Sequence, residues 1–327
     1  MIAGAREDAR FELAAVCSRT RERGEEFARK HGIPHVFTSL EEMTAGDTVD
    51  AVYIATPNCM HARQSIYCMS RGKHVLCEKP MASNAAEARA MIGASQRFGV
   101  TLMEAMKSTL SPNFRAVSEN LRRVGRVRRY FASFCQYSSR YDKFKEGTVL
   151  NAFRPELSNG AIMDIGVYAI YPAVVLFGAP RSIEAQGVLL SSGADGQGAV
   201  NMLYDGMNAT VLYSKIADSL LPSEIEGEQG NILVDRIQTP TDVRFYARTA
   251  PASGRGARPK PEQLSVASAY DEYYYEIAEF IDLVLAGEVS SRVNSHAASL
   301  AVMEIVDEVR RQIGVHYPAD DNPMLEM

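Results

Sequence analysis

The sequence lacks the cysteine pattern of a disulfide-rich protein. Its five cysteines are odd in number, scattered along 327 residues, and never form a Cys-x-x-Cys pair. Because disulfides persist mainly in oxidising compartments, this usage is typical of free thiols in a reducing cytosol. We therefore expect a cytoplasmic protein, and we assign no metal-binding residues.

A surplus of positive charge and a long hydrophobic run are also missing. The net charge is -5, which gives no electrostatic reason for binding to nucleic acid or to an anionic membrane. No apolar run approaches the roughly 20 residues of a membrane-spanning helix, and the N-terminus lacks the apolar core of a signal peptide. The expected product is a soluble globular protein whose partner is a small molecule.

Strands and helices alternate through the first third of the chain. Strands are predicted over residues 13–17, 36–37, 50–55, 74–77 and 100–103, and helices over about 20–31, 39–43, 59–70 and 84–98. This alternation predicts an α/β domain with a Rossmann-like parallel sheet and helices on both of its faces. We place this dinucleotide-binding domain over residues 1–107.

The pattern changes after about Gly125, where strands follow one another. A helix is predicted over 161–176, and strands over 127–137, 182–189, 199–204, 209–213, 224–226, 231–235 and 242–246. Such runs indicate an α+β domain with a mostly antiparallel sheet, which we place over residues 108–327. Residues 249–261 are expected to form a loop, and the helical tail from Ala269 is free to pack back on the first domain. Because the sheet would have one open face, we expect a homodimer or homotetramer.

One motif is absent where the fold would need it. A dinucleotide-binding domain opens with a strand and a Gly-x-Gly-x-x-Gly turn, whose amides hold the pyrophosphate. This sequence contains no such turn, so we expect the first, central strand to be missing, with unpaired edges left on its two neighbours. Either the given start is an internal methionine of a longer gene, or the cofactor site has been lost.

A short apolar strand ends on Glu78-Lys79-Pro80. Open α/β sheets bind ligands just beyond the carboxyl ends of their strands, so Lys79 is a candidate catalytic residue. Its ammonium group can hold a substrate hydroxyl and lower the pKa of a neighbouring phenol. The alternative is a solvated lysine at the end of a strand.

Two other strand ends carry candidate cofactor-binding residues. Ser18 and Arg19 follow the strand that ends at Cys17, and an arginine in place of an acid favours NADP over NAD, because it accommodates the 2′-phosphate. The residues after the strand at 50–55 are small or polar: Ala55, Thr56, Pro57, Asn58 and His61. The alternatives are an exposed helix start at Arg19 and a surface histidine at His61.

The helix over 161–176 is apolar except for one carboxylate and one phenol. Asp164 and Tyr168 are four residues apart, so they share one face of the helix and need partners if they are buried. Gly166 costs about 1 kcal/mol in a helix, which suggests that another group approaches there. Ser158 or Asn159 is the predicted N-cap, and a core tyrosine with a structural hydrogen bond is the alternative for Tyr168.

Together these pieces resemble the Gfo/Idh/MocA family of oxidoreductases. The matching motifs are Ala55-Thr56-Pro57-Asn58 with His61, Glu78-Lys79-Pro80, Met103-Glu104-Ala105 and Asp164-Ile165-Gly166-Val167-Tyr168. Tyrosine at the last position is similar to the dihydrodiol dehydrogenase and glucose-fructose oxidoreductase branch. The resemblance implies that Lys79 and Tyr168 form the active centre beside the nicotinamide, with Asp164 orienting the substrate and Glu78 at the cofactor.

The sequence thus predicts an NAD(P)-dependent oxidoreductase that acts on a hydroxyl or carbonyl group of a sugar, polyol or dihydrodiol-like substrate. NADP is the expected cofactor, and NAD is the alternative. Tyr168 would act as general base, its pKa lowered by Lys79. Further candidate substrate contacts, or else solvated loop residues, are Arg140, Tyr141, Lys143 and Asn151. Two other functions stay open: an NAD-assisted glycosidase of the same fold, and a non-catalytic nucleotide- or ligand-binding protein with a degenerate cofactor site.

Overall fold

Strands and helices alternate in the first domain of the structure, a computed structural model that describes residues 1–248 and 260–322. The strands are β1 (Ala15–Cys17), β2 (His35–Phe37), β3 (Ala51–Ile54), β4 (His74–Glu78) and β5 (Leu102–Ala105). The helices are α1 (Ile2–Ala5), α2 (Arg21–His31), α3 (Leu40–Thr44), α4 (His61–Ser70) and α5 (Ala85–Phe98). Local signals set the ends of α5, because Asn84 caps its first turn and Gly99 ends it in the left-handed conformation.

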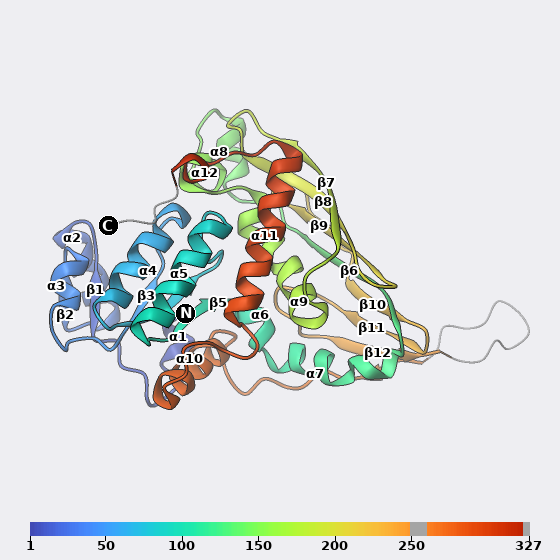
Figure 1. Cartoon of the computed structure of the whole chain (residues 1–327), viewed down its shortest axis with the longest axis horizontal. Coiled ribbons are helices and arrows are strands. Elements are labelled where there is room, and N and C mark those ends of the chain that lie inside the picture. The colour runs from blue at the N-terminus through green and yellow to red at the C-terminus, as the bar shows by residue number, and fades with distance from the viewer. Residues whose placement is uncertain (249–259, 323–327) are drawn as a thin grey trace, which may run out of the picture.

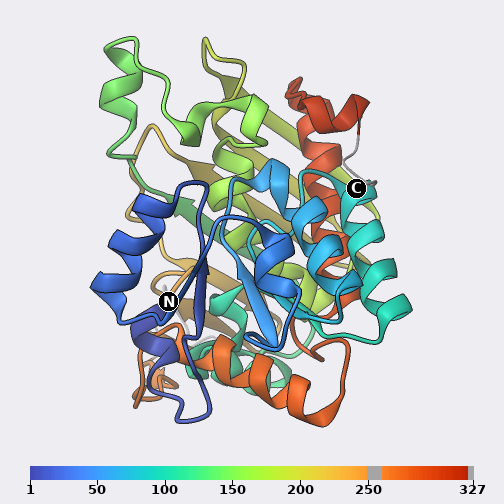
Figure 2. The same ribbon diagram turned by 90° about the vertical axis from the view of Figure 1, so that its left-hand side faces the viewer.

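The parallel sheet of this domain is divided in two. β1 pairs with β2, while β3, β4 and β5 form a separate three-stranded parallel sheet. Within residues 1–248 and 260–322 no strand lies between β1 and β3, as Figure 2 shows. The division agrees with the expectation that the central strand is missing.

The second domain is built around one eight-stranded sheet. Its strands are β6 (Val127–Cys135), β7 (Ser182–Leu189), β8 (Asp195–Leu203), β9 (Asn208–Ser214), β10 (Ser223–Gly227), β11 (Gly230–Val234), β12 (Val243–Ala247) and β13 (Glu262–Gln263). The strand order is β13-β12-β11-β10-β6-β9-β8-β7, and all neighbours are antiparallel except β6 and β9. The predicted mostly antiparallel sheet is confirmed.

Helices cover one face of the large sheet. The helices that follow α5 in the chain are α6 (Lys107–Leu110), α7 (Pro112–Asn120), α8 (Tyr141–Lys145), α9 (Val167–Phe177), α10 (Tyr274–Ala286), α11 (His296–Ile313) and α12 (Pro318–Asp321). α9 and α11 lie between the sheet and the first domain, and no helix of the described residues covers the opposite face of the sheet (Figure 1). The tail does not become helical at Ala269, since α10 begins five residues later, and α11 starts with His296 bonded to the carbonyl of Leu102 in the first domain.

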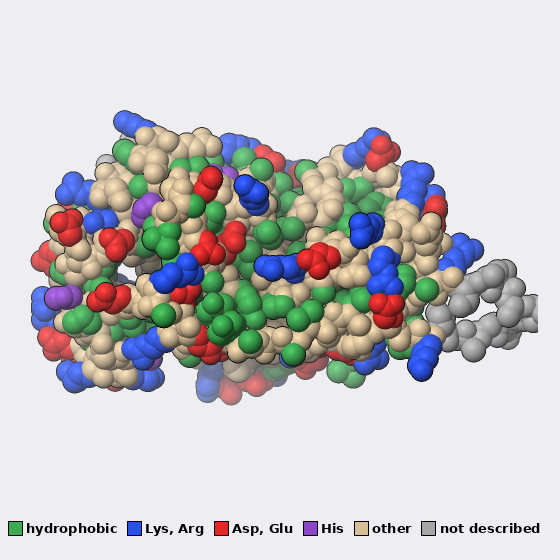
Figure 3. All heavy atoms as spheres, turned by 90° about the horizontal axis from the view of Figure 1, so that it is seen from below, with side chains coloured by type: hydrophobic (Ala, Val, Ile, Leu, Met, Phe, Trp, Pro, Cys, Tyr) green, Lys and Arg blue, Asp and Glu red, His purple; other side chains and the backbone are tan. Residues whose placement is uncertain are grey.

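The surface of the molecule carries charges of both signs. Lysines, arginines and acidic side chains are interspersed on the face seen in Figure 3, without a patch of one sign there. No helix in the described part of the chain is long and apolar enough to cross a membrane. Most of the predicted loop over 249–261 falls outside the described residues.

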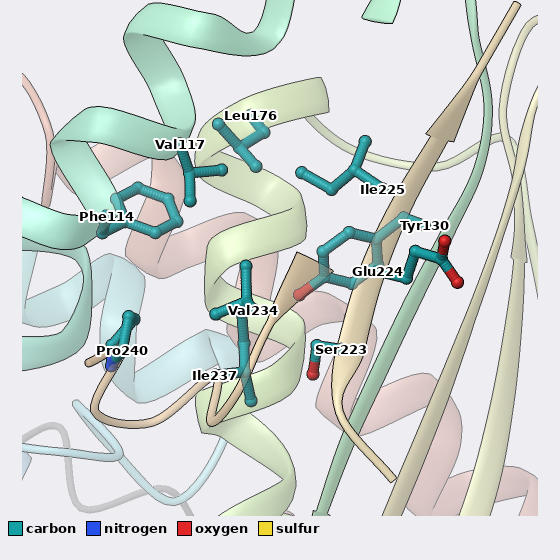
Figure 4. A pocket seen from close by; sticks show the side chains of 10 residues that line it. All are labelled: Phe114, Val117, Tyr130, Leu176, Ser223, Glu224, Ile225, Val234, Ile237 and Pro240. Atoms are coloured by element: carbon teal, nitrogen blue, oxygen red, sulfur yellow. The ribbon is translucent and has the colours of Figure 1, made fainter. Parts of the chain in front are cut away.

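A small hollow lies inside the second domain, between α7, α9 and the sheet (Figure 4). Its lining side chains are mostly apolar: Phe114, Val117, Tyr130, Leu176, Ser223, Glu224, Ile225, Val234, Ile237 and Pro240. The Tyr130 hydroxyl donates to the carbonyl of Ala169 at 2.8 Å, so this polar group is already satisfied. We interpret the hollow as a gap in core packing, apart from the residues that carry chemistry.

Candidate active site

Lys79 follows directly after β4, and its ammonium group reaches across to the second domain. Its Nζ donates to the backbone carbonyl of Asp164 at 2.8 Å and to Oδ1 of the same residue at 2.9 Å. The Nζ also lies 4.9 Å from the centroid of the Tyr168 ring. The structure therefore brings the three predicted catalytic residues together, although they come from two domains.

The segment that carries Asp164 and Tyr168 begins with a π-helical turn over Ile162–Gly166 and continues as α9. Its cap is Asp195 of β8, whose Oδ2 accepts a hydrogen bond from the Ile162 amide at 2.7 Å. The predicted cap at Ser158 or Asn159 is wrong, because the chain turns at Ser158 through a left-handed conformation before the helix starts. π-Helical turns are frequent at functional sites, where they redirect side chains.

Gly166 is placed where a side chain would collide. A Cβ atom there would lie 2.7 Å from Cδ1 of Ile162 and 3.3 Å from the ring of Tyr213 on β9, which confirms that another group approaches closely.

We expect Gly166→Ala to lower the free energy of unfolding by about 1–3 kcal/mol through overpacking. Gly93→Ala is the matched control: Gly93 lies within α5 with no atom within 4 Å of the added Cβ. It should raise the free energy of unfolding by about 0.5–1 kcal/mol through helix propensity. Urea unfolding of both variants checks this, and a shift of the same sign in both would contradict the close approach.

The backbone around Lys79 is fixed by two carboxylates. Glu78 accepts a hydrogen bond from the Tyr53 hydroxyl through Oε1, and from the Lys79 amide at 3.2 Å through Oε2. Glu104 of β5 accepts from the Met81 amide at 2.9 Å. Because both side chains bind within the protein, they hold the lysine in one direction before any ligand arrives.

Three of the predicted cofactor-binding side chains are committed to protein partners. His61 is only 1% exposed, and its two ring nitrogens lie 2.9 Å from the carbonyl oxygens of Thr56 and Pro80. Asn58 is buried and donates to the carbonyl of Ser158 at 2.8 Å, across the domain boundary. Glu78 holds Lys79 as described above. Backbone groups at buried strand ends need partners, so these side chains brace the site, and cofactor contact through them stays a prediction.

The other predicted cofactor-binding residues are open to solvent. Ala55, Thr56 and Pro57 are exposed after β3, and Ser18 is half-buried after β1. Arg19 is exposed, and in the described ranges no carboxylate pairs with its guanidinium group. A free cation beside a strand end fits a ribose phosphate, and an exposed strand-end backbone fits the close approach of a dinucleotide.

Asp164 is held between two lysines. Lys79 binds one carboxylate oxygen and Lys215 donates to the other. Burial alone would raise the pKa of Asp164, but the two ammonium groups outweigh it and hold that pKa well below its usual range. Sequence reasoning missed Lys215, although it follows directly after β9 in the same way that Lys79 follows β4. Among the described residues no group of His, Cys, Asp and Glu is suited to hold a metal ion.

Tyr168 presents a hydroxyl group that none of the described residues hydrogen-bonds, and its ring packs edge-on against Phe134. Burial, followed by the negative charge of Glu78, raises the pKa of this phenol above its ordinary value. The expected lowering by Lys79 is therefore wrong, because burial and the negative charges of Glu78 and Asp164 raise the pKa of the phenol. The phenol is the form present at neutral pH.

The predicted substrate contacts lie together in the connection before the π-helical turn. Tyr141 and Lys143 belong to α8 and Asn151 to a short 3₁₀ turn, and Lys143 is exposed and paired with Glu146 at 2.8 Å. Burial lowers the pKa of Lys215 and the positive charge of Arg140 adds to this effect, which places Arg140 near the charged cluster. Contact with substrate stays a prediction for all four.

Two family models match the chain. The model described as an oxidoreductase family with an NAD-binding Rossmann fold matches residues 2–106, and the GFO/IDH/MocA C-terminal domain matches residues 116–233. The first match covers the domain that contains β1 to β5, and the second covers β6 to β10 and most of β11 in the large sheet.

Named relatives match over nearly the whole chain. The scyllo-inositol 2-dehydrogenase (NADP(+)) IolU of Bacillus subtilis is 50% identical over 95% of this chain and 92% of its own length. The trans-1,2-dihydrobenzene-1,2-diol dehydrogenase of Danio rerio is 33% identical over 94% of this chain and 91% of its own. The fold is shared with the crystal structure of aldose-aldose oxidoreductase from Caulobacter crescentus, with a TM-score of 0.81 and 21% identity over 95% of this chain and 92% of that one.

Proposed function

We propose a reaction for this chain, which belongs to the Gfo/Idh/MocA family of NAD-binding oxidoreductases. It is an NADP-dependent dehydrogenase that interconverts a secondary hydroxyl and a ketone on a polyol of the inositol type. The observation that carries the proposal is the convergence of Lys79, Asp164 and Tyr168 beyond the carboxyl end of β4. The 50% identity to an NADP-dependent inositol dehydrogenase supports both the substrate class and the cofactor.

The residues of this chain supply binding and proton transfer. An ammonium group has three N–H donors, and Lys79 uses two of them on Asp164, which leaves one for the oxygen of the reacting substrate group. In oxidation the phenolate oxygen of Tyr168 takes the hydroxyl proton, and in reduction the phenol returns it to the carbonyl oxygen. The carboxylate of Asp164 accepts a hydrogen bond from a neighbouring hydroxyl of a polyol.

The cofactor, when bound, accepts or donates the hydride. Arg19 and Ser18 would hold its ribose phosphate, and the backbone at Ala55, Thr56 and Pro57 would lie beside it. The guanidinium group of Arg19 is exposed and has no carboxylate partner among the described residues, which favours NADP.

The test measures NADP⁺ reduction with scyllo-inositol, myo-inositol and a trans-dihydrodiol in separate assays, with NAD⁺ in parallel. We expect kcat/KM to be highest for an inositol with NADP⁺, and at least about tenfold lower with NAD⁺, which corresponds to roughly 1.4 kcal/mol. Identification of a keto product by mass spectrometry confirms oxidation of the ring. Absence of any turnover with all three substrates and both cofactors would contradict the proposal.

The rate of oxidation should rise with pH, whereas the rate of reduction should not. Because the pKa of Tyr168 is raised above its ordinary value, the phenolate is scarce at neutral pH and gains about tenfold per pH unit, while the phenol stays abundant. We therefore expect kcat for oxidation to climb without a plateau from pH 6 to about pH 10. Initial rates in both directions check this, and a plateau in oxidation near pH 7 would show that Tyr168 is not the base.

The open face of the large sheet supports a homodimer or homotetramer, because the exposed side chains of Val188 on β7 and Leu203 on β8 lie on one face of the sheet. Cytoplasmic location and oligomeric state both remain predictions.

A further inference from the structure

Lys215 is a buried lysine with no part in the reaction described above. Its side chain is 4% exposed, its Nζ binds Oδ2 of Asp164, and the ring of Phe153 lies 5.3 Å from the Nζ. Burying a cation in this way is unfavourable unless the charge is compensated. The carboxylate that pairs with Lys215 is that of Asp164, which already forms an ion pair with Lys79.

The cluster therefore contains two ammonium groups and one carboxylate, with a net charge of +1. The carboxylate of Glu78 lies beside this cluster, where it binds the Lys79 amide, so the feature peculiar to Asp164 is that two ammonium groups share one carboxylate. Lys79 is the more open of the two lysines, at 14% exposed against 4% for Lys215, and it is the one beside Tyr168.

The two lysines also fix the orientation of the carboxylate. Each binds a different oxygen of Asp164, so the group cannot rotate without breaking one of these contacts. The Nζ of Lys79 takes its own position from Oδ1 and from the backbone carbonyl of the same residue. A change at Lys215 is therefore transmitted to Lys79 through a single shared side chain.

We propose that Lys215 is a positioning residue, which holds Oδ2 of Asp164 so that Lys79 keeps its direction and its third N–H donor for the substrate oxygen. This role rests on the proposed function, because it needs a reaction in which negative charge develops on that oxygen. Lys215 itself does not touch the substrate.

The first experiment compares Lys215→Met with Lys73→Met in the whole chain. Lys73 is the matched control, because it precedes β4 at the end opposite to Lys79, and its one side-chain partner in the described part of the chain is the carbonyl of Gly46. We expect kcat of Lys215→Met to fall by about ten- to a hundredfold, as misplaced reacting groups do. The Kd for NADPH and the KM for the polyol should stay within about threefold, and Lys73→Met should match the wild type.

Thermal unfolding separates positioning from structural support. Removal of one buried cation leaves Asp164 paired with Lys79, so we expect Tm to be unchanged or raised. A fall in Tm together with weaker NADPH binding would assign Lys215 a merely structural role and overturn the proposal. So would a kcat within about twofold of the wild type.

Two more variants keep the test decisive if Lys215→Met does not fold. Lys215→Arg retains the charge and should recover most of kcat, whereas Lys215→Gln should not. Equal activity in the two would overturn the proposal.

A crystal structure of Lys215→Met, or of Lys215→Gln if the former does not fold, tests the inference without any turnover. We expect the carboxylate of Asp164 to rotate onto Lys79. An unchanged contact between Lys79 and Asp164 would overturn the proposal even if the enzyme were active. Conversely, the Asp164 carboxylate could rotate in the variant while the wild-type protein oxidises no polyol. This result would contradict the proposed function but would support the contact by which Lys215 positions Asp164.

Discussion

Tyr168→Phe should lower kcat by about 10²–10⁴-fold in both directions while the protein stays folded. The substitution removes the only group proposed to exchange a proton with the reacting oxygen, and such groups contribute rate factors of this size. The hydroxyl has no hydrogen-bond partner among residues 1–248 and 260–322, so its loss leaves no orphaned donor or acceptor there. Steady-state kinetics, with NADPH binding followed by fluorescence, measure the effect.

Tyr171→Phe is the matched control for this prediction. Tyr171 lies one turn further along α9, is fully buried, and hydrogen-bonds the Ser299 hydroxyl at 2.9 Å. Its substitution should cost about 1–2 kcal/mol of unfolding free energy, because Ser299 loses a buried partner, and should leave kcat almost unchanged. We therefore expect Tyr171→Phe to lower the free energy of unfolding but not kcat, and Tyr168→Phe to lower kcat but not the free energy of unfolding. Similar kcat values in the two variants would remove Tyr168 from the proposed reaction.

The elements of the fold could be predicted because their signals are local. The alternation of apolar strands with capped helices up to β5 depends on neighbours in sequence, and Asn84 and Gly99 mark the limits of α5 within a few residues. The meeting of Lys79 with Asp164 and Tyr168, by contrast, joins residues 85 or more positions apart, and it was accessible only through the resemblance to a family with the same ordered motifs.

The partners of these residues could not be predicted, because each is set by tertiary packing. Asp195 caps the π-helical turn from a neighbouring strand, and no spacing rule connects the two segments. His61 has the composition of a surface histidine on a helix, but the turn between β4 and α5 buries it. Lys215 had a usable signal, since it ends a strand as Lys79 does, but only the pairing of β9 with β6 brings that strand end to Asp164.

The pKa of Tyr168 shows a different limit of sequence reasoning. A lysine near a phenol lowers the pKa of the phenol only if burial and nearby negative charges do not outweigh its effect. Here the two nearest contacts of Lys79 are both on Asp164, while burial and Glu78 act on the phenol in the opposite direction. The sign of the shift thus depends on the sum of burial and all nearby charges, and this sum is a property of the folded site.

Lys79→Ala should lower kcat by about 10²–10³-fold, because the substrate oxygen loses its positively charged donor where negative charge develops. Leaving a buried charge without its partner typically costs about 3–5 kcal/mol, but Asp164 would still be paired with Lys215, so the loss of unfolding free energy should be smaller. Kinetics and urea unfolding of the same preparation check both statements.

Lys107→Ala provides the control, because Lys107 resembles Lys79 in its exposure and in having one ion pair and one aromatic neighbour. It is 13% exposed, forms an ion pair with Glu272, and lies 4.3 Å from the ring centroid of Tyr273. Its substitution removes the same kinds of contact, so it should have a comparable effect on stability and leave kcat within about threefold of the wild type. If both variants lost activity in proportion to stability, the ammonium group of Lys79 would be structural. A large loss of kcat confined to Lys79→Ala is the result that requires its charge at the reacting oxygen.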